Sequence, residues 1–227
     1  MERTRAAKVF SDPAVTQSQT LPQVLLARAK ATPAALAQRH KRLGIWREFT
    51  WVDVLQRVRA LALGLDDLGF GSGDSMMVIG ENEPEHFWAE YAAQSLGGKV
   101  ISVYPDQSSA EVHYLARDSE TRIFLVQDQE QVDKCLEIAG DLEGIIAIVY
   151  WDDAGLWTYA HPLLRSYQAV SDAGARRHDQ DPKLFEARVA RGRRGDIAVL
   201  SYTSGTTSKP KGVMISQRYL FDNSARV

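Results

Sequence analysis

The chain has 227 residues, of which 44% are hydrophobic and 25% charged, a composition typical of a globular protein with enough apolar material for a core. Its formal net charge of −2 and pI near 6.2 give no bulk electrostatic reason to bind nucleic acid. The single cysteine excludes an internal disulfide framework. No signal peptide is visible, and the longest apolar run, residues 145–151, is far shorter than the roughly 20 residues of a spanning helix, so we expect a cytoplasmic protein.

The first third of the chain predicts a helix, a strand pair and a second helix. A helical apolar pattern covers residues 21–32, and residues 36–49 fit two strands that turn at Gly44. Thr50 then caps a helix that ends at Gly69. The apolar residues of that helix share one face: Val54, Leu55, Val58, Leu61, Ala62 and Leu65.

The glycine-rich segment 69–74 invites comparison with a dinucleotide-binding loop. Its glycines are spaced by two and it follows a helix, whereas a Rossmann loop follows a strand, so we expect a turn into a strand at 75–79. Helices and strands then alternate, with helices at 84–96, 109–117 and 128–139 and strands at 99–103, 122–126 and 144–150. This alternation predicts an α/β fold whose parallel sheet is covered by helices on both faces.

Residues 151–162 predict a loop, followed by a helix at 163–169. Asp152 and Asp153 could ligate a metal, but neighbouring carboxylates in a turn are more typical of a solvated cap. Cys135 lies in a helical apolar pattern, which favours a buried structural thiol. The five histidines have no metal-ligand spacing and receive no catalytic role: His40, His86, His113, His161 and His178.

Residues 171–195 are dense in charge, and four arginines gather near their end: Arg188, Arg191, Arg193 and Arg194. Such a cluster can meet phosphate or lipid head groups, which leaves peripheral membrane contact open. A solvated helix face and linker is the favoured interpretation.

The segment 200–212 is the chemically informative one. It carries hydroxyls, glycines and two lysines between two short apolar runs that predict strands, 197–200 and 213–215. Consecutive backbone N–H groups beside glycine can form a concave anion nest, and the hydroxyls and ammonium groups add donors that no carboxylate opposes. An ordinary surface turn is the alternative, but it needs two to five residues. The order Pro210-Lys211-Gly212 also departs from a Walker A loop, so the segment predicts a different phosphate-binding loop.

This loop resembles that of the adenylate-forming enzymes, the superfamily of acyl- and aryl-CoA synthetases, firefly luciferases and peptide-synthetase adenylation domains. The family loop has the pattern Thr/Ser-Ser/Thr-Gly-Thr-Thr-Gly-x-Pro-Lys-Gly, and residues 203–212 follow it with Ser208 in place of a glycine. Residues 96–105 and the helix and strand after them match the first α/β subdomain of that family. The segment 151–162 is similar to bacterial long-chain fatty acyl-CoA synthetases.

The resemblance implies a role for each loop residue. Backbone N–H groups and hydroxyls of the loop would line the pyrophosphate of ATP, the Thr206 hydroxyl would contact Mg²⁺, and Lys211 would add charge. Lys209 matches a variable position. The implied nucleotide-binding residues are Thr203, Ser204, Gly205, Thr206, Thr207, Ser208, Lys209, Lys211 and Gly212. None of them is implied to be a catalytic acid or base.

The resemblance also implies a domain plan and a reaction. Residues 1–20 would be a tail, 21–196 the first α/β subdomain, and 197–227 the phosphate loop and the start of the next segment of a truncated domain. Family members join a carboxylic acid to ATP as acyl-AMP and then transfer the acyl group to coenzyme A. We expect an N-terminal part of such a synthetase, inactive alone, with a long-chain fatty acid as substrate. An aryl-acid or peptide-synthetase adenylation domain and a non-enzymatic nucleotide-binding module remain alternatives, and the oligomeric state stays open.

Overall fold

The computed structural model describes residues 17–203 and 209–224. Its helices are α3 (Leu21–Ala31), α4 (Trp51–Asp67), α5 (Pro84–Ser95), α6 (Ser109–Asp118), α7 (Gln129–Ala139), α8 (Tyr167–Gln180), α9 (Leu184–Val189) and α10 (Gln217–Ser224). Its strands are β1 (Leu36–Arg42), β2 (Ile45–Thr50), β3 (Ser75–Ile79), β4 (Lys99–Val103), β5 (Thr121–Val126), β6 (Ala147–Tyr150), β7 (Leu164–Ser166), β8 (Ile197–Thr203) and β9 (Lys211–Ser216).

Seven of the strands form one sheet in the order β7-β6-β5-β3-β4-β8-β9. Every neighbouring pair is parallel except the last, in which β9 runs antiparallel to β8. The strands β1 and β2 form a separate antiparallel pair. The predicted α/β fold with a mostly parallel sheet is therefore confirmed.

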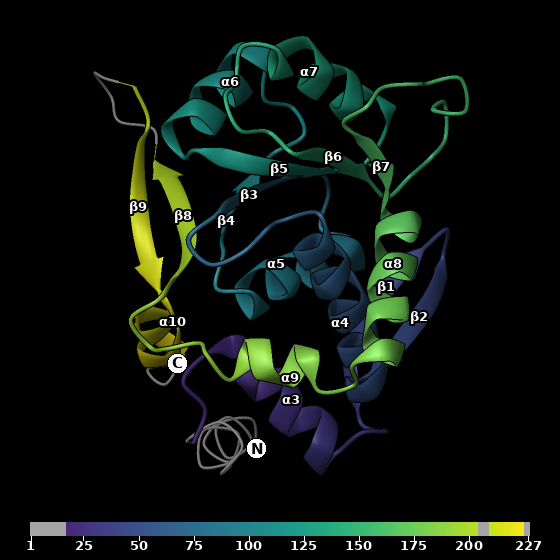
Figure 1. Cartoon of the computed structure of the whole chain (residues 1–227), viewed down its shortest axis with the longest axis vertical. Coiled ribbons are helices and arrows are strands. Elements are labelled where there is room, and N and C mark those ends of the chain that lie inside the picture. The colour runs from purple at the N-terminus through teal and green to yellow at the C-terminus, as the bar shows by residue number, and fades with distance from the viewer. Residues whose placement is uncertain (1–16, 204–208, 225–227) are drawn as a thin grey trace.

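Helices cover both faces of this sheet and enclose two apolar cores (Figure 1). One core packs α3, α4, α5, α8 and α9 against the sheet and contains Leu61, Trp88 and Phe185. The other lies under α6 and α7 and contains Phe124 and Cys135. Cys135 is fully buried, as predicted, and burial raises the pKa of its thiol.

The helix starts follow the capping residues that the sequence offers. Thr50 and Asp53 form a capping box at the start of α4, in which each side chain accepts from the backbone N–H of the other residue. Ser108 and Glu111 form the equivalent box at α6. Asp128 caps α7 by accepting the backbone N–H of Gln131.

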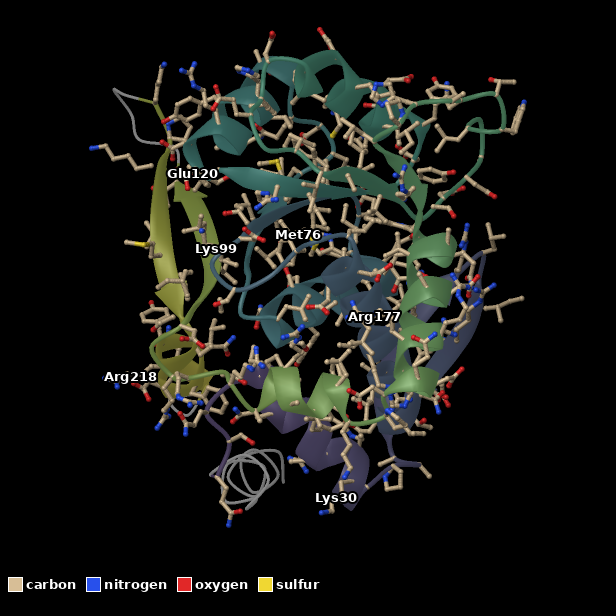
Figure 2. All side chains as sticks on the ribbon, viewed as in Figure 1. Lys30, Met76, Lys99, Glu120, Arg177 and Arg218 are labelled. Atoms are coloured by element: carbon tan, nitrogen blue, oxygen red, sulfur yellow. The ribbon has the colours of Figure 1, made fainter. Side chains whose placement is uncertain are left out.

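Charged side chains tie α8 and α9 to the end of α4. Arg177, labelled in Figure 2, reaches from α8 to Asp66 at 2.8 Å, and Arg188 reaches the same carboxylate from α9 at 3.1 Å. Asp66 is mostly buried, so these two contacts are screened less than ordinary surface ion pairs. The helices of this face are thereby fixed relative to one another.

The predicted helix at 163–169 is wrong. Leu164–Ser166 instead form the edge strand β7, which pairs in parallel with β6, and the helix begins only at Tyr167 after the cap Ser166. A segment of three residues is too short to show either period, and its pairing with β6 decides for the strand. Across the described ranges 17–203 and 209–224, no helix is long and apolar enough to cross a membrane.

Candidate phosphate-binding site

The candidate site lies where β8 and β9 are joined. The two strands pair as an antiparallel hairpin whose last pair is Thr203 with Lys211. In Figure 1 this hairpin is the yellow-green pair at one side of the sheet. Thr203, Lys209, Lys211 and Gly212 are described and gather at its end. Five of the predicted residues lie outside the described residues, including the predicted metal contact Thr206; the five are Ser204, Gly205, Thr206, Thr207 and Ser208.

A cleft of about 620 Å³ opens next to this hairpin. It is lined by residues that follow β3, residues of β4 and its carboxyl end, and residues of β8, among them Asn82, Ser102, Tyr104, Ser201 and Tyr202. Open α/β sheets bind their ligands outside the carboxyl ends of the parallel strands. The hairpin and the cleft therefore occupy the edge of the sheet at which such a fold binds small molecules.

Helix α6 contacts both sides of the hairpin end. The Tyr114 hydroxyl donates to the carbonyl oxygen of Pro210 at 2.8 Å. The Tyr202 hydroxyl donates to a carboxylate oxygen of Asp118 at 2.7 Å. The Lys209 ammonium lies 5.2 Å from the centroid of the Tyr114 ring, which places this lysine against α6. The sequence analysis missed Tyr114 and Asp118, and no local pattern distinguishes them from other residues on a helix.

Tyr202 crosses from β8 to the opposite residue of β9, Gly212. A Cβ atom at Gly212 would lie 3.0 Å from Cζ of the Tyr202 ring, so the glycine makes room for the ring. Burial raises the pKa of Tyr202, and the hydrogen bond to Asp118 raises it further. The phenol is therefore neutral and donates to the carboxylate across the ordinary pH range.

A small polar cluster lines the cleft beneath the hairpin. Ser102 of β4 donates to a carboxylate oxygen of Glu90 at 2.8 Å, and Nε2 of His86 lies 3.1 Å from the Ser102 hydroxyl oxygen. His86 is buried, and both His86 and Glu90 come from α5. The spacing of four residues on a helix is a signal that could have paired His86 with Glu90 in advance.

The other predicted polar groups have local structural partners. Asp152 accepts from the backbone N–H of Ala154, which agrees with a cap in a turn. Arg193 donates to three backbone carbonyls, and Arg194 lies 3.8 Å from Asp222. Within residues 17–203 and 209–224, no group of three or more histidine, cysteine or acidic side chains is arranged to hold a metal ion.

A more apolar cavity of about 570 Å³ lies between β1 and α5. Its walls include three indole rings, those of Trp46, Trp51 and Trp88. Its walls contain no residue of the β8–β9 hairpin, whereas Ser201, Tyr202 and Pro210 of the segment that carries the predicted phosphate-binding residues line the cleft. We therefore place the candidate site at the β8–β9 hairpin and its neighbouring cleft.

Comparison with known proteins identifies the family of the chain. The profile described as AMP-binding enzyme matches residues 25–227. A long-chain-fatty-acid–CoA ligase of Mycobacterium tuberculosis, FadD15, is 27% identical over 177 residues, which cover 78% of this chain and 28% of that protein. The long-chain-fatty-acid–CoA ligase heimdall of Drosophila melanogaster is 30% identical over 182 residues, covering 79% and 26%. The chain thus spans about a quarter of the length of these relatives.

Solved structures share the fold. The anthranilate CoA ligase AuaEII in complex with anthranoyl-AMP matches 90% of this chain and 36% of its own with a TM-score of 0.70 and 20% identity. A fatty acyl-adenylate ligase of L. pneumophila, solved with acyl adenylate and pyrophosphate, matches 93% and 33% with a TM-score of 0.66 and 20% identity. The family profile extends over most of the sequence and includes the hairpin, its loop and the cleft residues, so this chain belongs to the AMP-binding enzyme family.

Proposed function

We propose that this chain forms the pyrophosphate-gripping part of an acyl-CoA synthetase that acts on a long-chain fatty acid. The observation that carries the proposal is the β8–β9 hairpin, which presents a phosphate-loop sequence at the ligand-binding edge of a parallel sheet. The substrate class follows from the relatives, which are named long-chain-fatty-acid–CoA ligases.

The reaction has two steps. A carboxylate oxygen of the acid attacks the α-phosphorus of ATP, the new P–O bond forms, and the bond to pyrophosphate breaks. The thiolate sulfur of coenzyme A then attacks the acyl carbon, and AMP leaves with the electron pair of the C–O bond.

Negative charge grows on the departing pyrophosphate in the first step, and fixed donors placed around it stabilise the transition state. The donors in this proposal are N–H groups, hydroxyls and ammonium groups of residues 203–212. Lys211 follows directly on Pro210, whose carbonyl Tyr114 holds, so its backbone begins β9 from a fixed position. ATP would enter as its magnesium complex. The hydroxyl oxygen of Thr206 is the kind of ligand this hard cation accepts, with substrate phosphates and water completing its shell.

An aryl acid is the second candidate substrate, because a structure with the same fold is an anthranilate CoA ligase. The test is ATP–pyrophosphate exchange by the synthetase that carries this chain, with hexadecanoate, benzoate, anthranilate and a panel of amino acids. We expect exchange to depend on hexadecanoate. Exchange with benzoate or anthranilate alone would move the substrate class to aryl acids, and exchange with amino acids alone to a peptide-synthetase role. If the protein binds ATP but none of these acids supports exchange, it is a nucleotide-binding module.

A further inference from the structure

We propose that helix α6 holds the phosphate-binding hairpin in its working geometry, with Tyr114 and Asp118 as positioning residues for the pyrophosphate of ATP. This inference rests on the proposed function and names side chains that the loop sequence does not contain. Both residues act through the strand ends that they contact.

The two side chains lie one helical turn apart on α6 and reach opposite strands of the hairpin. Tyr114 bonds the carbonyl of Pro210, on the β9 side, and Asp118 accepts from Tyr202, on the β8 side. Residues four apart on a helix point to the same side. One face of α6 therefore contacts both stems of the loop.

The contact at Pro210 replaces a bond that the hairpin itself does not supply. The β8–β9 ladder ends at the pair Thr203 and Lys211, so Pro210 lies one residue beyond the last pair. A carbonyl that leaves a ladder needs another donor if it is sheltered from water, and Pro210 is half-buried. The Tyr114 hydroxyl is that donor. The Lys209 ammonium packs over the same ring and strengthens the attachment of this stem.

The position of Asp118 supports a role beyond helix stability. It is the last residue of α6, where a carboxylate meets the negative end of the helix dipole and destabilises the helix. Its carboxylate accepts a hydrogen bond from Tyr202, whose ring is held against Gly212 of β9. The charge of Asp118, although unfavourable at the end of the helix, thus fixes the Tyr202 ring, which lies across both strands.

The consequence is preorganisation. Donors that are already in place when charge develops on pyrophosphate need no rearrangement during the reaction. Loosening either stem would therefore slow adenylation. Thioester formation from preformed acyl-AMP involves no pyrophosphate and would not change, whereas a general loss of folding would slow both steps.

The experiment uses the synthetase that carries this chain and measures both half-reactions. Tyr114→Phe removes one hydroxyl and keeps the ring, and Asp118→Ala removes the acceptor for Tyr202. Each is expected to lower kcat/KM for ATP in pyrophosphate exchange about fivefold, the effect of one net hydrogen bond, and to leave thioester formation unchanged. Asp118→Asn keeps an acceptor oxygen and is expected to restore exchange.

Tyr159→Phe is the matched control. Tyr159 lies on the segment that leads to β7, at the opposite edge of the sheet, and it also donates to an aspartate, Asp133 of α7. It should leave both half-reactions unchanged. Wild-type exchange in Tyr114→Phe and Asp118→Ala would overturn the proposal. So would a parallel loss of both half-reactions.

Calorimetric binding of magnesium pyrophosphate separates this proposal from the proposed function. If none of the acids tested supports exchange by the wild-type protein, the synthetase assignment fails. The affinity for magnesium pyrophosphate then decides the role of α6. About fivefold weaker binding by Tyr114→Phe than by Tyr159→Phe would support that role. Equal affinities, or no binding by the wild-type protein, would overturn it.

Discussion

The described part of the chain contains two antiparallel hairpins, and they are built in opposite ways. The β1–β2 hairpin turns through Leu43 and Gly44, whose φ angles of 49° and 82° are both positive, as a type I′ turn requires. The β8–β9 hairpin is joined by residues 204–210, beyond its last pair. Its stems are held from outside by Tyr114 and Asp118 of α6.

This difference separates a structural hairpin from a functional one. A two-residue turn is fixed by the conformations of its own residues. A longer connection exceeds the two to five residues that strand pairing needs. Contacts from another element then supply the rigidity that a turn would have provided.

Thr206→Ala should give the largest effect. It removes the hydroxyl that contacts Mg²⁺ in the proposed pyrophosphate site, and loss of one preorganised group that stabilises developing charge typically lowers kcat about 100- to 1000-fold. ATP–pyrophosphate exchange by the synthetase measures this, and the thermal midpoint should stay unchanged. Full exchange activity in this variant would refute the role of Thr206.

Gly212→Ala should have an intermediate effect. The new Cβ would lie 3.0 Å from the Tyr202 ring, so the ring must shift and its bond to Asp118 weakens. Overpacking of this kind costs about 1–3 kcal/mol, and we expect exchange to fall about tenfold. The same substitution in a Tyr202→Phe background should cost less, because the hydroxyl bond is already absent. An equal fall in exchange in the two backgrounds would show that Gly212→Ala does not act by weakening the bond between Tyr202 and Asp118.

Leu43→Asn should stabilise the β1–β2 hairpin and leave ATP–pyrophosphate exchange unchanged. Leu43 is 95% exposed and holds a positive φ, which a leucine adopts at a cost of about 1 kcal/mol. Asn-Gly is a preferred type I′ pair, so the thermal midpoint should rise by about 2–4 °C. Calorimetry measures the shift and exchange serves as the control. A changed KM for ATP would contradict the separation of the two hairpins.

The smallest effect concerns the ionisation of Tyr202. Burial and the Asp118 hydrogen bond raise the pKa of this phenol above its ordinary value near 10. A folded-state pKa above the unfolded one stabilises the protein below the unfolded pKa, and this contribution disappears as the pH rises through the folded pKa. Titration of ¹³C-labelled tyrosine followed by NMR should therefore show Tyr202 still protonated at pH 10, and Asp118→Ala should lower its pKa. Ionisation of Tyr202 with the ordinary tyrosine pKa near 10 would contradict the hydrogen bond to α6.

Much of the fold could be predicted because its determinants are local. Thr50 and Asp128 mark the starts of their helices, because their side chains cap nearby N–H groups. The turn at Gly44 follows from the conformational freedom of glycine. The β7 strand at Leu164 could not be predicted in this way. Its assignment depends on pairing with β6, which sequence periodicity does not specify for so short a run.

The site was predictable only in part, for a related reason. The loop residues follow a contiguous pattern, so the phosphate-binding role of 203–212 could be inferred from sequence. The tethers join residues 96 and 84 positions apart, Tyr114 with Pro210 and Asp118 with Tyr202. Nothing in the local pattern of α6 selects these two polar residues from the other polar residues of the helix.

In the proposed function, the β8–β9 hairpin, and not its β1–β2 counterpart, grips pyrophosphate. Titration of magnesium pyrophosphate into the ¹⁵N-labelled chain, followed by backbone amide NMR, tests it most directly. We predict saturable shifts for amides of residues 201–212 and for Tyr114 and Asp118, with residues 36–50 unmoved. Shifts centred on residues 36–50, or none at 201–212, would contradict the account.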